Sequence, residues 1–431
     1  MHEGIKKLLG PPTYQFIGVL ALLFILVGLV ASSAMMSMGV IGLAMVWVLH
    51  PQIKSNVQAL LRQPVFWTIV LLFITWGISG LWSENTDYWA NRMRMRLPFL
   101  LMPAGLLAIP RFDRKVYYPL LYGFFLLLSV ICLCLLAWYL VNFSEITLAY
   151  KKGQVLPTPV MHIRFSLMVA YSVAIGITFL QEKWTWRYAW ERGLQYFLTG
   201  FLILFLHILA VRSGLVALYG VLFYFLIREI VLRRRWWFGI MAALLMVVGM
   251  ATAYFTLPSL QNKIDYTLYN LYHIRHDSNS TELSDSHRVG TIQAGLAMGN
   301  EAPILGVGVG DVRDKTEDYL QVNYPSVAGS GFTPQSQYVW QYASMGWVGL
   351  LLFIVVTLLP LFYKNGWKYA LLGSFLAIAI PSFIIEQTLE TQLGTAIYLV
   401  FLLMAARYYF IEDLSDHSRL HQPLVPLAGD N

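Results

Sequence analysis

The sequence predicts an all-α integral membrane protein with about twelve transmembrane helices. Hydrophobic residues make up 58% of the 431-residue chain and charged residues only 12%, and the mean hydropathy is +0.60, far above the usual values for soluble domains. Apolar segments long enough to cross about 30 Å of hydrocarbon recur along most of the chain. The one long interruption covers residues 258 to 335. These observations exclude a soluble globular fold.

The expected spans divide the chain into four parts. Residues 1–257 carry helices 1 to 9, residues 258–335 form a large outer loop, residues 336–411 carry helices 10 to 12, and residues 412–431 form a tail. The fourth span is short, and the seventh and eighth nearly touch. The twelve spans are expected near residues 14–31, 33–50, 65–82, 97–110, 117–141, 161–180, 195–211, 214–232, 236–256, 337–363, 368–385 and 392–411.

Cysteine usage and the N-terminal segment add little to this prediction. Cys132 and Cys134 are close neighbours on one expected helix and point to different faces, so no disulfide framework or cysteine metal site is implied. The first apolar segment follows Lys6 and Lys7 without a small-residue cleavage site. We expect a retained helix there.

The distribution of basic residues predicts the orientation. Cytoplasmic loops of membrane proteins carry an excess of Lys and Arg. A cytoplasmic N-terminus places most of the chain's 30 Lys and Arg residues on that side, including the run from Arg233 to Arg235, and makes the C-terminus cytoplasmic too. The net charge of +7 is therefore mostly a topology signal. Nucleic-acid binding has no support, because no soluble domain carries a basic face.

The basic residues that depart from this rule predict a functional site on the outer side. Arg164, with His162 beside it in TPVMHIRFSL, and Arg212 in VRSGL lie near outer helix ends. Arginines that converge from separate helices form an anion site, since the guanidinium group is planar and permanently charged. Arg212 is equally typical of an interfacial arginine whose charge reaches toward water. The other outer basic residues are Arg92, Arg94, Arg96, Lys151, Lys152, Lys263, Arg275, Arg288, Arg313 and Lys315.

An anion site at the outer face of a many-span protein predicts a lipid-linked phosphate or pyrophosphate as ligand, stabilised by fixed cations without a nucleotide. Two carboxylates are candidates for the same site. Glu386 and Glu390 in SFIIEQTLETQLG face one side if the segment is helical; an interfacial cap between spans 11 and 12 is the alternative. Ser83 and Glu84, before the arginines of WANRMRMRLP, indicate an amphipathic helix or lipid-headgroup contact.

The large loop is too long for a plain connection and is expected to be functional. It contains SDSHRVGTIQAGLAMG at residues 284–299, which predicts a capped amphipathic helix, followed by the glycine-rich turn PILGVGVGDVRD. The spacing is not GxGxxG and no strand precedes it, so a dinucleotide site is rejected. Packing of the loop against the membrane surface would explain the glycines.

Taken together, VRSGL, SHRVGTIQAGL, PILGVGVGD, PQSQYVWQYASMGWVGLLLF, WANRMRMRLPFLLMP and LETQLG resemble the O-antigen ligase family of polytopic membrane glycosyltransferases. The resemblance covers most of the chain. It implies a GT-C-like, all-helical membrane fold in a bacterial inner membrane, with the active face and the large loop periplasmic. It also implies that Arg212 and Arg288 contact the pyrophosphate of an undecaprenyl-pyrophosphate-linked glycan.

The chain departs from the family pattern at the head of span 10. The family typically carries a His-Asn-x-Tyr pattern there, whereas this chain has Gln335 and Ser336, followed by Tyr338. Glutamine is no general base at neutral pH, although it can hydrogen-bond a sugar or phosphate oxygen. His162, His287 and Glu386 are the alternative bases, and each histidine is equally typical of a structural hydrogen-bonding residue.

The resemblance implies a metal-independent ligase, without cofactors, that transfers the glycan to lipid A-core or a related acceptor. The catalytic candidates are Arg212, Arg288, Gln335 and His162; the substrate-binding candidates are Arg164, Arg96, Tyr338, Glu386 and Glu390. A polymerase that extends lipid-linked repeat units is the first alternative. A flippase of the lipid-linked glycan is less well supported, because no internal repeat is evident. An inactive glycan-binding relative is a further alternative.

Overall fold

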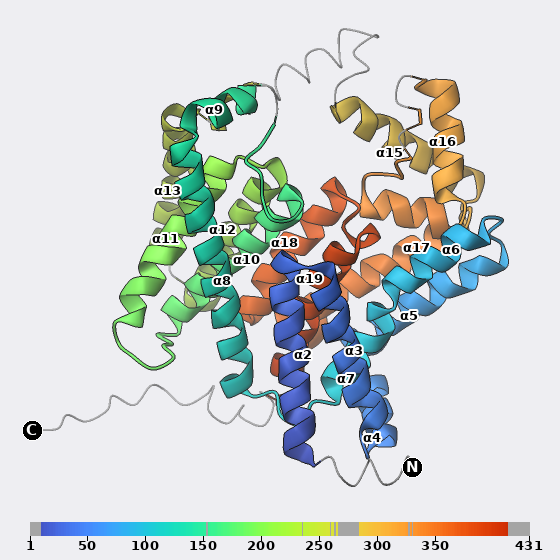
Figure 1. Ribbon diagram of the computed structural model, residues 1–431, viewed down its shortest axis with the longest axis horizontal. Coiled ribbons are helices and arrows are strands. Elements are labelled where there is room, and N and C mark those ends of the chain that lie inside the picture. Colours follow the sequence, from blue (N-terminus) through green and yellow to red (C-terminus); the bar gives the residue numbers. More distant parts are fainter. Residues whose placement is uncertain are drawn as a thin grey trace, which may run out of the picture.

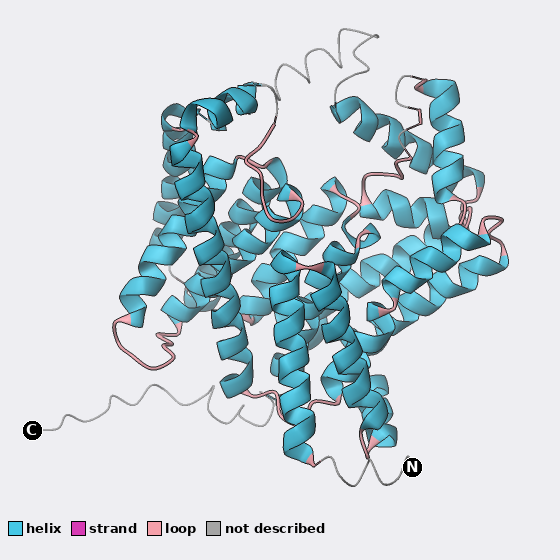
Figure 2. Ribbon diagram, viewed as in Figure 1, coloured by secondary structure: helices cyan, strands magenta, loops and turns pink. Residues whose placement is uncertain are grey.

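Helices account for all the regular structure that the computed structural model describes (Figure 2). The described residues are 10–151, 154–234, 236–258, 260–262, 264–265, 284–325, 328–329 and 331–412. The predicted all-helical membrane fold is therefore confirmed. Lys152, Arg235, Lys263, Arg275 and the tail from residue 413 lie outside the described residues.

A helix is present at each of the twelve predicted spans. These helices are α2 (Pro11–Ala31), α3 (Ser33–Leu49), α5 (Pro64–Ile78), α7 (Pro98–Leu107), α8 (Arg114–Val141), α10 (His162–Gln181), α11 (Glu191–Leu209), α12 (Arg212–Arg233), α13 (Trp236–Thr256), α17 (Gln337–Phe362), α18 (Ala370–Ile385) and α19 (Gln392–Arg407).

The number of membrane crossings stays a prediction. Within the described residues, eight helices are long and apolar enough to cross a membrane, or nine if α3 and the bent α4 (Ile53–Arg62) form one span. The predicted fourth span is the weakest, because the 10 residues of α7 cover only about 15 Å. Helix α6 (Thr86–Arg96) leads into α7 through Leu97, whose backbone is also helical. A crossing at this position would therefore include polar residues of α6.

Three further helices lie at the end of the bundle that carries the large loop (Figure 1). Helix α9 (Phe143–Lys151) follows α8, and the loop contains α15 (Ser284–Glu301) and α16 (Val312–Asn323). The helix predicted at residues 284–299 is therefore present. Several of its glycines serve close packing: a Cβ at Gly299 would lie 2.3 Å from the ring of Tyr342 on α17.

The centre of the bundle is formed by α10 and α19. In the most apolar 18-residue stretch of each helix, the share buried inside the protein is 83% for α10 and 94% for α19. These shares are larger than for any other candidate span. Helix α19 contacts α2, α3, α7, α10 and α18 and lies in the middle of the view in Figure 1.

Polar contacts join the chain turns at two opposite ends of the bundle. At one end, the Tyr14 hydroxyl donates to the Leu49 carbonyl at 2.8 Å, and Arg407 Nη2 donates to the Ile109 carbonyl at 3.4 Å. At the other end, Gln392 Nε2 donates to Ser37 Oγ at 2.8 Å. The first end carries the basic loops that the sequence assigns to the cytoplasm. The sidedness itself stays a prediction.

Helix α17 differs from the single straight span predicted for residues 337–363. Gly346 has φ 59° and ψ −157°, which breaks the helix into two parts. The rings of Tyr338 and Phe353, one on each part, lie 5.3 Å apart, whereas a straight helix would separate them by about 22 Å. The part before Gly346 therefore folds back against the part after it. This explains why an apolar helix begins with polar residues: they belong to the returning part, next to the site described below.

The break at Gly346 generates a prediction. A Cβ at this position would lie 2.4 Å from the Ile304 carbonyl carbon, and the positive φ disfavours L side chains. We expect Gly346→Ala to lower the free energy of unfolding by about 1–3 kcal/mol from backbone strain alone, as measured by denaturant titration in micelles. Gly123→Ala is the matched control, because nothing lies within 4 Å of its Cβ position on α8. Equal stability of the two variants would contradict the break.

Candidate functional site

The site is built around the segment 386–391, which connects α18 to α19. Glu386 has an extended backbone, with φ −140° and ψ 150°, and Thr388–Glu390 form a short 3-10 turn. The expectation that Glu386 and Glu390 share one face of a helix is therefore wrong. The two carboxylates instead point to different arginines, and each defines a separate cluster.

The Glu386 cluster brings together arginines from two distant elements. Arg288 of α15 donates through Nη2 to Glu386 Oε1 at 2.6 Å, and Arg164 Nη1 lies 3.7 Å from Glu386 Oε2. Arg164 is buried, whereas the side chain of Arg288 is 27% exposed. Nε and Nη1 of Arg164 have no hydrogen-bond partner. Two guanidinium groups share one carboxylate here, so the cluster has excess positive charge and free donors.

Gln335 belongs to the same cluster. Its Oε1 accepts a hydrogen bond from Arg288 Nε at 3.4 Å, so the amide orients the guanidinium group. Gln387, which the sequence analysis did not single out, also contributes. Its carbonyl accepts from Arg164 Nη2 at 3.5 Å, and its side chain accepts from the Thr333 hydroxyl. A run of polar residues between two apolar helices was the only signal in the sequence for this residue.

The Glu390 cluster lies deeper in the protein. Arg96 Nη2 donates to both carboxylate oxygens of Glu390, at 2.6 and 2.7 Å, and its guanidinium group lies 4.3 Å from the ring of Trp76 and 4.5 Å from that of Trp340. Arg96 is 1% exposed. Gln337 Nε2 donates to Glu390 Oε1 at 3.2 Å. Protein groups thus surround Arg96, and its ion pair with Glu390 holds the 386–391 segment in place.

The remaining candidates lie on adjoining elements. Arg212 is the first residue of α12 and its side chain is exposed. A Cβ at Gly214 would lie 2.4 Å from that of Ser166, so the first turns of α12 and α10 touch. His162, the first residue of α10, is half-buried. Arg212 and His162 therefore belong to the same end of the bundle as Arg164.

Tyr338 and His287 make aromatic contacts near the site. The ring of Tyr338 packs against the rings of Phe353 and Phe383, so Tyr338 lies outside the arginine cluster. The ring of His287 packs against Phe332 at 5.6 Å, next to Arg288. Nδ1 of His287 is buried and has no hydrogen-bond partner.

The glycines of the turn pack against protein, which explains them without a membrane contact; packing of the loop against the membrane surface stays a prediction. Asp311 accepts hydrogen bonds from the backbone N–H groups of Glu84 and Asn85 at 3.0 and 2.9 Å. Gly308 has φ +96°, and a Cβ there would lie 2.5 Å from Ser83 Oγ. Ser83 and Glu84, which indicated a lipid contact, instead bind this turn. It fixes α15, and with it Arg288, to the end of α5.

The family comparison agrees with the sequence motifs. The O-antigen ligase family model matches residues 197–354. This match confirms the predicted resemblance to the family over that part of the chain. None of the curated proteins matches the chain significantly. The family indicates a bacterial membrane protein of the O-antigen ligase or polymerase type, with a glycosyltransferase-like activity. The O-antigen ligase match contains Arg212, Arg288 and Gln335 and ends before Glu386; Arg164 precedes it. The tertiary structure adds these last two residues to the site.

The Arg96–Glu390 pair generates a prediction about stability. Removal of one partner of a buried ion pair leaves an uncompensated charge, which costs about 3–5 kcal/mol. We expect Arg96→Met to lower the free energy of unfolding by about this amount in denaturant titrations. Arg94→Met is the matched control on the same helix, because Arg94 is exposed. An Arg96→Met variant as stable as the control would contradict the supporting role of the pair.

Proposed function

We propose that the chain is an O-antigen ligase-type glycosyltransferase that moves a glycan from undecaprenyl pyrophosphate to an acceptor at the periplasmic face of the inner membrane. The observation that carries this proposal is the convergence of Arg164 and Arg288 on the single carboxylate of Glu386. Lipid A-core is the acceptor that the family resemblance favours. The first alternative, a polymerase, uses the same donor and a second lipid-linked glycan as acceptor.

The charge of the site suits a pyrophosphate. Arginine binds phosphate oxygens through two parallel N–H groups, and in a partly buried site such contacts are stronger than in water. Arg212 and His162 start α12 and α10, whose N-terminal ends carry the positive pole of the helix dipole. An anion between these helix ends and Arg288 would meet positive charge from several sides.

In this proposal Glu386 is an internal counterion. Its carboxylate neutralises part of the arginine charge in the absence of substrate. A pyrophosphate that binds Arg288 carries more negative charge and displaces the carboxylate. Glu386 is then released beside the reacting glycan.

The released carboxylate provides a route for the reaction. The acceptor hydroxyl attacks the anomeric carbon while the bond from that carbon to the pyrophosphate oxygen breaks, so the configuration inverts. The hydroxyl proton passes to Glu386, and the pyrophosphate leaves with its charge held by Arg288, Arg164 and Arg212. Gln335 takes no proton in this scheme and holds Arg288. His287 and His162 remain the alternative acceptors of the proton.

A polymerase function has one specific observation in its favour. Gln335 stands where the family typically carries a histidine, so the acceptor side of the site differs from that of the ligases. A flippase has weaker support, since the buried charges of the described residues gather at the bundle ends rather than along a path between them. An inactive relative would bind the donor without transfer.

Substitution of the arginines tests the pyrophosphate site. We expect Arg288→Ala and Arg212→Ala each to lower the rate of transfer by about 100-fold or more, because each removes a cation from the developing negative charge. Transfer is measured with purified protein in detergent, and membrane insertion and thermal stability of the variants should match the parent. Arg94→Ala is the control with the same charge change at the same end of the bundle. Full activity of both variants would show that the site is misplaced.

The acceptor is tested in the same purified system. Undecaprenyl-pyrophosphate-linked glycan is supplied as donor, and lipid A-core or an excess of the lipid-linked glycan is supplied as acceptor in separate reactions. We expect glycan to appear on lipid A-core. Longer lipid-linked chains in place of this product would make the protein a polymerase. Donor binding without any product would make it an inactive relative.

A further inference from the structure

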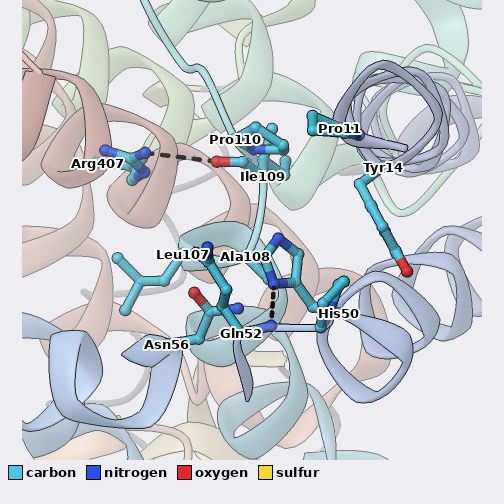
Figure 3. A pocket seen from close by; sticks show the side chains of 11 residues that line it. Pro11, Tyr14, His50, Gln52, Asn56, Leu107, Ala108, Ile109, Pro110 and Arg407 are labelled. Carbon is cyan, nitrogen blue, oxygen red and sulfur yellow. Dashed lines mark hydrogen bonds between the residues drawn. The ribbon is translucent and has the colours of Figure 1, made fainter. Parts of the chain in front are cut away.

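A cavity lined by polar and apolar residues (Figure 3) lies at the end of the bundle opposite the Glu386 cluster. Its volume is about 330 Å³, and 11 residues line it. They come from the start of α2, the junction of α3 and α4, the end of α7 and the end of α19. The cavity shares no residue with the proposed glycan site. Its function is therefore a separate question.

The cavity has hydrogen-bond donors without partners. Arg407 is 6% exposed, and its Nε and Nη1 have no hydrogen-bond partner. Nδ2 of Asn56, on the facing side of the cavity, is also buried and without one. Buried donors of this kind are normally satisfied by protein groups or water, so these are available to bind an acceptor. None of the described residues that line the cavity is Asp or Glu.

His50 adds a further donor. The backbone N–H of Gln52 donates to His50 Nδ1 at 3.1 Å, which assigns Nδ1 as an acceptor. A neutral imidazole with an acceptor at Nδ1 carries its hydrogen on Nε2. The ring packs against Tyr14, with 5.0 Å between the ring centroids, so its orientation is held. His50, Asn56 and Arg407 thus offer donors and no charged acceptor.

The charge around the cavity is positive. Glu412 Oε1 lies 2.7 Å from Arg407 Nη2 and balances one charge. Lys54 lies between two lining residues of the α4 region, and Arg111 follows the lining residue Pro110; both side chains are exposed. The Glu412 carboxylate binds the Nη2 corner of the guanidinium group. Nε and Nη1, which point to different sides of the group, each keep an unpartnered N–H that can donate a single hydrogen bond.

Helix α4 places the cavity at the depth of the lipid headgroups. It bends away from α3 by 112°, and none of its residues is fully buried. Val57 and Leu61 are exposed apolar residues on a helix that also carries Lys54 and Arg62. An amphipathic helix at right angles to the spans lies in the membrane interface. The cavity beside it therefore faces lipid phosphates.

We propose that this cavity binds the phosphate group of an anionic membrane lipid. Arg407 donates to a phosphate oxygen through one of its unpartnered N–H groups, Asn56 and His50 donate to the remaining oxygens, and Lys54 and Arg111 attract the headgroup from the rim. The bound lipid joins α2, α4, α7 and α19. The site acts independently of glycan transfer.

Lipid binding by the purified full-length protein tests this proposal. Native mass spectrometry measures retained lipid after titration with phosphatidylglycerol, with zwitterionic phosphatidylcholine, which has no net charge, as the comparison. We expect Arg407→Gln to weaken phosphatidylglycerol binding about tenfold, because a charge-assisted hydrogen bond is lost. Because Arg407 is buried, Asn56→Leu is the second variant and should weaken binding severalfold. Arg62→Gln is the matched control: Arg62 is exposed on the same α4 and does not line the cavity.

The outcomes separate the possible sources of the phosphate. Selective retention of phosphatidylglycerol that both cavity variants lose and the control keeps would support the lipid site. If inorganic phosphate alone raises the thermal midpoint of the protein as much as phosphatidylglycerol does, the cavity binds an anion. The lipid would then not be the source of the phosphate. Equal retention of both lipids, or unchanged binding in both cavity variants, would overturn the proposal. Glycan transfer is not a readout here, so failure of either proposal leaves the other intact.

Discussion

The ion pair between Arg96 and Glu390 is the constraint on which the rest of the site depends. A guanidinium group inside a helical bundle is unfavourable unless it is paired and its flat faces are covered. Glu390 supplies the charge, and Trp76 and Trp340 cover the two faces. The pair leaves the 386–391 segment little freedom of position. Glu386, at the other end of this short segment, is thereby held where Arg164 and Arg288 reach it.

The same segment explains how residues far apart in the chain form one site. Arg164 comes from a central helix, Arg288 from the large loop and Glu386 from the connection between the last two helices. The loop is anchored by Asp311 to the end of α5, and the break at Gly346 turns Gln335 and Gln337 toward the two carboxylates. Each of these contacts is made by backbone or buried polar groups. Such contacts fix the position of a side chain more precisely than apolar packing alone.

The two ends of the bundle have different chemistry. The end with the large loop carries arginines partly neutralised by carboxylates, a state that a more strongly charged ligand can change. The opposite end carries a cavity with unpaired donors beside an interfacial helix. An enzyme that takes its substrate from the bilayer needs a fixed depth in the membrane. A lipid bound at the far end would hold that depth without taking part in the reaction.

The sequence by itself determined the helices and the arginines of the site. Long apolar runs must form helices in a bilayer, because each backbone group needs a partner there; this is why each predicted span contains a helix. Charge placement predicted Arg164, Arg212 and Arg288 on the outer side; the structure brings them to one end of the bundle, whose sidedness stays a prediction.

Only the tertiary structure decided which charges meet. Arg96 and Glu390 are 294 positions apart, and nothing local selects one partner over another. Glu386 and Glu390 were expected on one helix face, but the segment between them is not helical. The break at Gly346 was missed because glycine is common in membrane helices, and its positive φ is imposed by contact with the loop at Ile304. Apolar patterning acts over neighbouring residues, whereas ion pairs and close backbone contacts are selected by the packing of the whole chain.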